Sequence, residues 1–216
     1  MSSKLVVHDL TLRPTGDVPP VQVEVDLPRG GAVVMQGPSG SGKTTFLRIL
    51  ARLRAAESGE VFLDGRSWRE IAPREWRRKV HFVPSKPHFS DGPVAKALRV
   101  PFCVRIGRGE PYPAERVKEL ARRLLLPEKV MERETRVLSD GERARVGILR
   151  SLLVRPDVLL ADEPTAPLDS KSRDAMLDLL AELQEKEGLS LLVVAHDGGV
   201  AERLGARMLR PWEDEA

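Results

Sequence analysis

The sequence predicts an α/β fold in which a mostly parallel sheet is covered by helices and a helical subdomain is inserted. Two observations carry this prediction. Short, continuous apolar runs at residues 32–36, 157–161 and 189–195 are typical of strands buried on both faces of a parallel sheet. Between about residues 85 and 155 the composition and the periodicity change: prolines and arginines become frequent, and apolar residues recur at helical spacing.

The first part of the chain is expected to form strands followed by one helix. Residues 4–7 and 21–27 are predicted strands, the second because apolar and polar residues alternate strictly, and the turn-forming segment RPTGDVPP joins them. The strand at 32–36 ends at a glycine-rich loop, and a helix over 44–54 follows. That helix is indicated by the spacing of its apolar residues, Phe46, Leu47, Leu50 and Leu53.

The remaining elements alternate between strands and helices. In chain order we expect strands at 58–65 and 80–83, helices at 113–126 and 142–153, a strand at 157–161, a helix at 173–186, a strand at 189–195, a short helix, and a last strand near 206–210. This order predicts a single domain over 1–216. Its core would consist of 1–84 and 156–216, with the helical subdomain at 85–155.

The composition suits one domain and limits the class of partner. The 216 residues are 41% hydrophobic, and 35 basic against 32 acidic residues leave a net charge of +3, too balanced to indicate nucleic acid. The single cysteine, Cys103, cannot form an internal disulfide, which favours a reducing compartment. No apolar run approaches the ~18–20 residues that span a bilayer, and the first ten residues do not resemble a signal peptide. A cytoplasmic protein is expected.

Residues 37–45 read GPSGSGKTT and follow an apolar strand. They satisfy the pattern G-x-x-x-x-G-K-[ST], whose glycines let backbone N–H groups turn inward on phosphates. Lys43 is placed to reach the β and γ phosphates, and the Thr44 hydroxyl to bind Mg²⁺. The residues expected to hold nucleotide phosphates are Gly37, Pro38, Ser39, Gly40, Ser41, Gly42, Lys43, Thr44 and Thr45. The alternative, a chance glycine-rich turn, is disfavoured by the strand before the loop and the amphipathic helix after it.

An acidic pair, Asp162 and Glu163, follows the apolar run VLLA at the carboxyl end of a predicted strand. Ligands bind at this edge in open α/β sheets. Asp162 is suited to hold Mg²⁺ through water, and Glu163 to orient or deprotonate an attacking water. Alone, such a pair would be read as a solvated turn. Together with the loop at 37–44 it indicates a site for nucleotide hydrolysis.

Residues 138–142 read LSDGE and lead into RARVGILRSLLVRPDVLLADEPTAPLD, and His196 follows the run LLVVA. On these motifs, their order and their spacing, nearly the whole chain resembles the ABC ATPase family, whose signature is typically LSGGQ. The resemblance implies a P-loop NTPase (RecA-like) core with a mostly parallel sheet, an N-terminal antiparallel β portion and an inserted α-helical subdomain. It also implies an ATPase that uses ATP and Mg²⁺ to power a membrane transporter.

The resemblance further implies a head-to-tail homodimer formed on ATP binding. Its signature, here Ser139, Asp140, Gly141 and Glu142, would meet the γ-phosphate held by the other subunit. Read from the residues alone, Ser139-x-x-Glu142 is also a capping box that opens a helix. Both interpretations can hold, because a capped helix N-terminus is itself a phosphate-binding end.

The resemblance implies roles for two further residues. His196 is implied to hydrogen-bond the γ-phosphate, so that it acts in catalysis with Glu163 and Lys43. Asp169 is implied to link the two active sites. A lone histidine is otherwise more often structural.

The sequence departs from the family's pattern at Ser85, Asp140, Ala166 and the region of Arg13 and Pro14. Ser85 stands where a glutamine usually touches Mg²⁺, and it cannot span the same gap without a water. Asp140 replaces a glycine with a carboxylate that would repel a γ-phosphate. Arg13 and Pro14 occupy the region of the aromatic that stacks on adenine, where the guanidinium could stack instead. An active ATPase, which these departures could slow, is expected; a degenerate subunit of an asymmetric pair is the alternative.

The implied partner is an integral membrane permease, which would hold the chain on the inner face of the cell membrane, and no nucleic acid is expected. The permease would dock near residues 85–105, where Phe89, Val100 and Phe102 are the exposed apolar candidates. The alternative is that these three residues close the core of the helical subdomain.

Residues 84–106 and 111–127 faintly resemble compact stand-alone ATPases that pair with a membrane protein proposed to export iron. Two other classes stay open. A soluble ABC ATPase of nucleic-acid or translation maintenance usually carries a long coiled-coil insert or two fused halves, and neither fits in 216 residues. A P-loop kinase or GTPase would not explain LSDGE, and no guanine-specific N-K-x-D motif is present.

Overall fold

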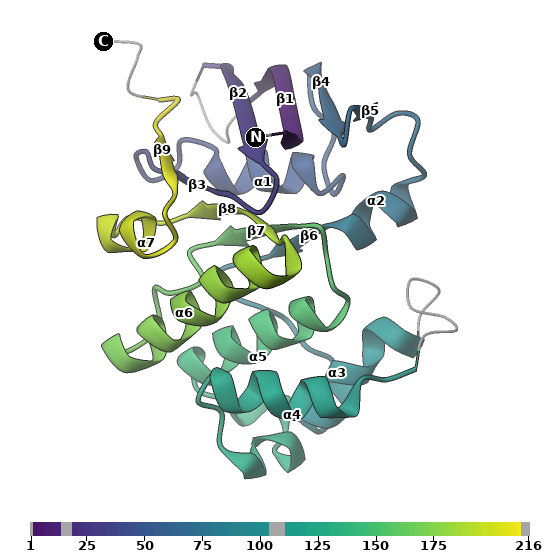
Figure 1. The fold of residues 1–216 in the computed structure, drawn as a ribbon, viewed down its shortest axis with the longest axis vertical. Helices are drawn as coiled ribbons and strands as arrows, with labels where there is room; N and C mark the ends of the chain where they lie inside the picture. The colour runs from purple at the N-terminus through teal and green to yellow at the C-terminus, as the bar shows by residue number, and fades with distance from the viewer. Residues whose placement is uncertain (1, 14–18, 104–110, 213–216) are drawn as a thin grey trace.

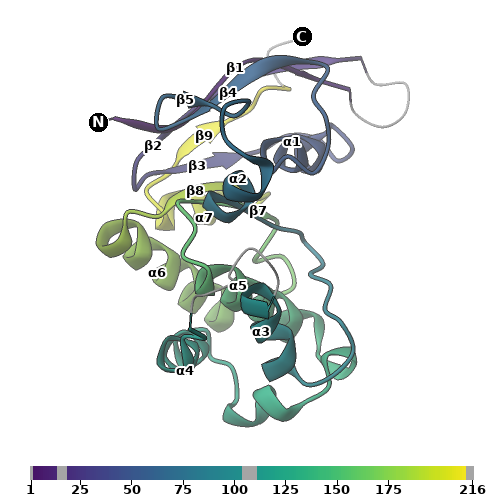
Figure 2. The same cartoon turned by 90° about the vertical axis from the view of Figure 1, so that its right-hand side faces the viewer.

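The computed structural model describes residues 2–13, 19–103 and 111–212. Two sheets lie one above the other, and most of the helices lie on the far side of the second sheet (Figure 2). This is the predicted α/β architecture.

The upper sheet is antiparallel, with the strand order β2-β1-β4-β5. Its strands are β1 (Ser3–Leu12), β2 (Val21–Pro28), β4 (Ser58–Leu63) and β5 (Arg66–Ser67). The alternation predicted for 21–27 is confirmed, because the apolar side chains of β2 are buried and its polar ones are exposed. β1 runs beyond the predicted residues 4–7, through a register shift between Val7 and Leu10 where Asp9 has a φ of 51°. A bulge of this kind breaks the alternation on which strand prediction depends.

The lower sheet is parallel, with the strand order β6-β7-β8-β3-β9. Its strands are β3 (Ala32–Met35), β6 (Val80–Val83), β7 (Val158–Asp162), β8 (Ser190–Val194) and β9 (Arg207–Leu209). Along β7, Leu159 and Ala161 join the core formed with the lower helices, whereas Val158 and Leu160 join the core beneath the antiparallel sheet. The apolar runs are continuous because alternate side chains enter two different cores.

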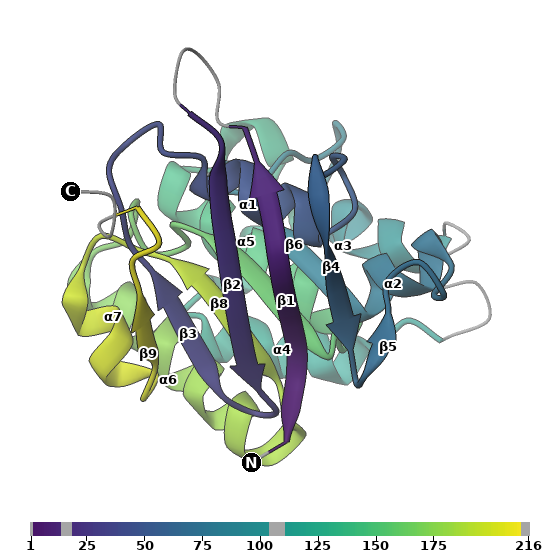
Figure 3. The same cartoon turned by 90° about the horizontal axis from the view of Figure 1, so that it is seen from above.

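The helices are α1 (Lys43–Leu50), α2 (Pro73–Lys79), α3 (Val94–Cys103), α4 (Ala114–Arg123), α5 (Asp140–Leu153), α6 (Ser170–Glu187) and α7 (Gly198–Arg203), with 3₁₀ turns at Glu128–Glu132 and Thr135–Val137. α3, α4 and α5 gather at the end of the molecule far from the antiparallel sheet (Figure 1). Viewed from above, α1 lies behind the strands of that sheet (Figure 3), and its apolar side chains belong to the core between the two sheets.

The structure differs from the sequence prediction at several elements. α2, α3 and β5 were not predicted, and α3 contains Pro101, a residue that usually argues against a helix. The helix predicted to reach residue 54 ends at Leu50. It ends there because Arg52 has a φ of 54°, and its guanidinium donates to the carbonyl oxygens of Trp68 and Ile71 at 2.7 and 2.6 Å.

Two properties bear on the predicted organisation. Apolar residues of 85–155 and of the lower face of the sheet form one continuous core cluster, and the subdomain boundaries stay a prediction. In the part of the chain that the structure describes, no helix combines the length and the apolar character needed to cross a membrane.

Candidate functional site

The phosphate loop connects β3 to α1 at the carboxyl edge of the parallel sheet. Gly40 and Gly42 have φ angles of 80° and 103°, which residues with a Cβ rarely adopt, and Gly42 directly precedes α1. The loop therefore delivers its backbone into the first turn of a helix, whose free N–H groups favour an anion. Within the described residues the Ser41 hydroxyl is buried without a hydrogen-bond partner, so a polar group of the loop is available to a phosphate oxygen.

Lys43 lies with its amine inside this loop. The side chain is buried, and Nζ donates to the carbonyl oxygens of Gly37 and Pro38 at 2.8 and 2.6 Å. Burial lowers the pKa of the Lys43 ammonium, and the carboxylates of Glu163 and Asp162 oppose part of that effect. The lysine is thus held at the loop with much of its hydration removed, which strengthens its attraction to phosphate.

Thr44 and Asp162 meet across the sheet. The Thr44 hydroxyl donates to Asp162 Oδ2 at 2.8 Å, and Asp162 ends β7 with only 4% of its surface exposed. Burial raises the pKa of the Asp162 carboxyl; the Thr44 hydrogen bond lowers it, and the charge of Glu163 raises it further. A hydroxyl beside a carboxylate is an oxygen pair of the kind that Mg²⁺ prefers, so these two residues fit the ion.

Glu163 and His196 stand next to this pair. Glu163 Oε1 lies 3.2 Å from His196 Nε2, and the Glu163 backbone N–H donates to the carbonyl oxygen of Val194 at 2.9 Å. Glu163 has a φ of 47°, a left-handed conformation that is costly for a residue with a long side chain.

A small cavity of about 240 Å³ opens at this pair. Its lining includes Glu163, Ala166, His196 and Asp197. The cavity provides room for a water molecule or a phosphate beside the Glu163 carboxylate.

Ser139 opens α5 as the predicted capping box. Its hydroxyl accepts from the Glu142 N–H at 3.2 Å, and Glu142 Oε2 accepts from the Ser139 N–H at 3.0 Å. Partial burial raises the pKa of the Glu142 carboxyl, but hydrogen bonds from Ser139 and from the Arg133 guanidinium outweigh it and hold that pKa below its ordinary value. Glu142 is therefore occupied in holding the helix start, whereas Asp140 in the first turn is exposed.

The signature packs against the loop that follows the acidic pair. A Cβ on Gly141 would stand 3.1 Å from the carbonyl oxygen of Pro167, so a larger residue would push these segments apart. Ser85, Asp140, Glu163 and Ala166 line one cavity of about 320 Å³, which also includes Pro167. Ser85 is thus near Glu163, and its predicted contact with Mg²⁺ stays a prediction.

Asp169 caps α6. Its carboxylate accepts from the Ser172 N–H at 2.9 Å and from the Ser172 hydroxyl at 2.8 Å, and these hydrogen bonds lower its pKa. Its geometry accounts for a helix cap, and the predicted link between two active sites stays a prediction.

The structure thus brings Lys43, Thr44, Asp162, Glu163 and His196 together at one edge of the sheet, and the catalytic and metal-binding roles assigned to them stay predictions. Within the chain, the Ser139 side chain forms its hydrogen bonds inside its own capping box.

Sequence reasoning missed Trp212, which contacts Gly37 of the phosphate loop. No local pattern around residue 212 points to that contact. Arg13 pairs with Glu57 at 2.9 Å, and Pro14 lies outside the described residues.

The apolar candidates for docking have different environments. Val100 is 39% exposed, whereas Phe89 and Phe102 are partly buried against the core. Phe89 lies under the Arg150 guanidinium, and Phe102 packs edge to face on Tyr112. Both phenylalanines therefore help to close the helical core, and residues 104–105 of the predicted docking segment lie outside the described residues.

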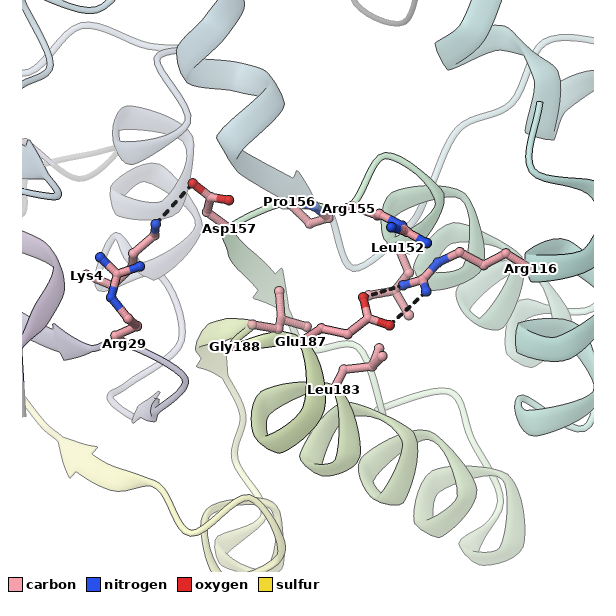
Figure 4. A pocket seen from close by; sticks show the side chains of 11 residues that line it. Lys4, Arg29, Arg116, Leu152, Arg155, Pro156, Asp157, Leu183, Glu187 and Gly188 are labelled. Atoms are coloured by element: carbon pink, nitrogen blue, oxygen red, sulfur yellow. Dashed lines mark hydrogen bonds and ion pairs between the residues drawn. The ribbon is translucent and has the colours of Figure 1, made fainter. Parts of the chain in front are cut away.

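A larger cavity, of about 720 Å³, lies at the opposite edge of the parallel sheet (Figure 4). Asp157 and Leu189, which line it, directly precede β7 and β8. Two of its cations are matched within the chain, since Lys4 pairs with Asp157 and Arg116 with Glu187. Because phosphate-binding loops follow the carboxyl ends of parallel strands, this cavity is not part of the nucleotide site.

The chain was compared with protein-family models, curated proteins and solved structures. The family model described as ABC transporter matches residues 21–166. ABC transporter I family member 17 of Arabidopsis thaliana is 36% identical over 194 residues, covering 89% of this chain and 73% of that protein. The molybdenum import ATP-binding protein ModC of Pseudomonas aeruginosa is 36% identical over 197 residues, covering 88% of this chain and 53% of ModC.

The solved dimeric structure of MJ0796, a bacterial ABC transporter cassette, is similar with a TM-score of 0.82 and 28% identity, covering 96% of this chain and 94% of that one. A second structure of MJ0796 is a dimer in a post-hydrolysis state bound to ADP and Pi. The chain spans only 53% of ModC and 61% of several other curated relatives. The resemblance to iron-export ATPases stays a prediction.

Proposed function

The chain belongs to the ABC transporter family of ATP-binding domains, and from that premise we propose that it binds Mg²⁺-ATP and hydrolyses it to drive a membrane transporter. The observation that carries the proposal is the convergence of three contacts at one sheet edge. These are Lys43 on the loop carbonyls, Thr44 on Asp162, and Glu163 beside His196.

The phosphates of ATP are proposed to lie in the loop at 37–45. Lys43 would leave its carbonyl partners in part to contact the β and γ phosphates, and the Ser41 hydroxyl and the N–H groups at the start of α1 would bind the remaining oxygens. The Ser41 hydroxyl and these N–H groups are in place before the reaction, so they would stabilise the transferring phosphoryl group with little rearrangement.

Thr44 and Asp162 are proposed to hold Mg²⁺, Asp162 through a water molecule. Bound there, the ion would neutralise charge that develops on the β and γ oxygens. The buried Asp162 carboxylate is disfavoured as an anion without a cation beside it, which supports this assignment.

Glu163 is proposed to orient the attacking water and to accept its proton, while the bond between the γ phosphorus and the bridging oxygen breaks. The His196 imidazole, 3.2 Å from the Glu163 carboxylate, would fix that side chain and donate to a γ-phosphate oxygen.

Two copies are proposed to bind two nucleotides between them, head to tail. The capped N-terminus of α5 suits this role, because the Ser139 hydroxyl and the free N–H groups there can meet a γ-phosphate held by the partner. The dimeric structures of MJ0796 support this arrangement for a similar cassette.

The proposed partner is an integral membrane permease, which would place the chain on the inner face of the cell membrane. The match of residues 21–166 to the ABC transporter family model supports this assignment. A degenerate, slowly hydrolysing subunit is the second candidate, favoured by the exposed Asp140 carboxylate in the first turn of α5.

The test is steady-state ATP hydrolysis by the purified chain, with Glu163→Gln beside it. Glu24→Gln is the matched control, because Glu24 is exposed on β2 away from the loop. We expect Glu163→Gln to lower the hydrolysis rate by about 10²–10⁴-fold, to bind ATP normally and to accumulate as an ATP-bound dimer by size. The control should retain wild-type activity.

Two results would contradict the assignment. A Glu163→Gln variant with wild-type activity would remove Glu163 from the chemistry. A wild-type chain that binds ATP without hydrolysing it, even with dimer formed, would favour the degenerate subunit.

A further inference from the structure

Trp212 reaches the phosphate loop because of the topology of the parallel sheet. The edge strand β9 pairs in parallel with β3, and the Gln36 N–H donates to the Leu209 carbonyl oxygen at 2.9 Å. Because the pairing is parallel, with Met35 opposite Leu209, both strands end at the same edge of the sheet. The residues after Leu209 therefore run beside the first residues of the loop.

The indole ring occupies the space that a side chain at residue 37 would need. A Cβ on Gly37 would stand only 2.6 Å from Trp212 Cε3, so a side chain there would force the ring or the loop to shift. Gly37 has an unexceptional backbone and is not among the glycines with positive φ. At this position the ring, and not a positive φ, leaves no room for a side chain.

The same ring faces the cation of the loop. Lys43 Nζ lies 5.9 Å from the Trp212 ring centroid, within the range of a cation–π interaction. That amine also donates to the Gly37 carbonyl oxygen at 2.8 Å. The ring thus packs on the residue that carries the acceptor and lies within cation–π range of the lysine that donates to it.

The environment of the indole nitrogen also points to a specific placement. In the part of the chain that the structure describes, Trp212 Nε1 is buried with no hydrogen-bond partner. Leaving a buried donor unpaired is unfavourable, so the contacts of the ring face must offset that cost.

We propose that Trp212 is a positioning residue for Lys43: its ring holds the Gly37 corner of the loop and keeps the lysine amine inside the loop that is proposed to bind the β and γ phosphates. This rests on the proposed function of the loop. Lysine has a flexible four-carbon stem, and without the ring it would lose order and regain water. The ring acts on the phosphate end of the nucleotide, so its loss should weaken ATP and inorganic tripolyphosphate alike.

The test measures the affinity of the full chain for Mg²⁺-ATP and for Mg²⁺-tripolyphosphate by calorimetry. The variants are Trp212→Ala, Trp212→Phe and the control Trp68→Ala. Trp68 is a partly buried tryptophan of the same core cluster, but it packs edge to face on Trp76. Thermal unfolding without ligand establishes that each variant is folded.

We expect Trp212→Ala to bind both ligands about 3- to 30-fold more weakly, the range expected for a cation–π contact. Trp212→Phe keeps a ring face and should stay within about threefold of wild type, as should Trp68→Ala. Trp212→Ala and Trp68→Ala each remove an indole from the same core cluster. If only Trp212→Ala weakens binding, the cause is the position of Trp212 beside the loop and not a general loss of packing.

Three results would overturn the inference. The first is that Trp212→Ala binds both ligands with wild-type affinity, and the second is that Trp212→Phe binds as weakly as Trp212→Ala. The third is that Trp212→Ala loses affinity for ATP and keeps its affinity for tripolyphosphate, which would make Trp212 a contact of the adenine base. If the wild type binds tripolyphosphate and not ATP, the proposed function fails while Trp212 is still tested on the loop. Binding of neither ligand would overturn both.

Discussion

His81 on β6 should make the protein sensitive to acid. Burial lowers its pKa from 6.5 to about 4, and the neighbouring Arg150 guanidinium adds to this, although a hydrogen bond with the Arg77 backbone opposes it. The folded protein therefore binds fewer protons at His81 than the unfolded chain between these two pH values. The stability that the neutral imidazole contributes is complete above pH 6.5 and is lost as the pH falls toward 4.

The size of this effect follows from the shift. One pKa unit corresponds to about 1.36 kcal/mol, so a change from 6.5 to about 4 corresponds to roughly 3 kcal/mol for a fully buried group. The His81 residue is only partly buried, so solvent reduces the effect to about 1–3 kcal/mol. For a chain of this size, each kcal/mol corresponds to about 2–4 °C in the melting temperature.

The assay compares urea unfolding of wild type and His81→Gln at pH 7 and at pH 4.5, without nucleotide. Glutamine can still donate to the Arg77 backbone but cannot gain a charge, so the variant should lose about 1–2 kcal/mol less stability on acidification. His8→Gln, which replaces an exposed histidine on β1, controls for the loss of an imidazole. Equal losses in wild type and His81→Gln would refute the reasoning.

Two further predictions concern the site. Asp162→Asn keeps an acceptor for the Thr44 hydroxyl and removes a buried carboxylate whose pKa is raised. The nucleotide-free protein should therefore be more stable by about 0.5–2 kcal/mol, and Mg²⁺-dependent hydrolysis should be lost. A variant that is less stable than wild type in thermal unfolding would contradict this. Ser139→Ala removes the cap of α5, so it should lower the free energy of unfolding in urea by about 1 kcal/mol. It should also weaken ATP-induced dimerisation, measured by size. An unchanged dimer would show that Ser139 does not contact the nucleotide held by the partner.

The chemistry-bearing residues could be predicted because their signals are local. The glycines of the phosphate loop, the capping box at Ser139 and the acidic pair after β7 each depend on neighbours within a few positions. The buried strands were equally clear, because a strand with a core on each face needs an unbroken apolar run.

Other elements could not be predicted because distant contacts determine them. The helix from Lys43 ends at Leu50 because Arg52 donates to carbonyl oxygens of Trp68 and Ile71, which are remote in sequence. α2 is short, and its one fully buried side chain, Trp76, donates to the carbonyl oxygen of Leu50 at 2.6 Å. A single anchor of this kind leaves no periodic pattern to detect.

By itself, the sequence determined the class of fold, the identity of the phosphate loop and the residue types that a nucleotide hydrolysis site needs. The tertiary structure decided which of them meet. Thr44 and Asp162 are 118 residues apart and come within 2.8 Å because β7 and the start of α1 share one edge of the sheet. Trp212 reaches Gly37 only because β9 pairs beside β3, and that pairing depends on backbone hydrogen bonds between distant strands, which no local pattern of side chains encodes.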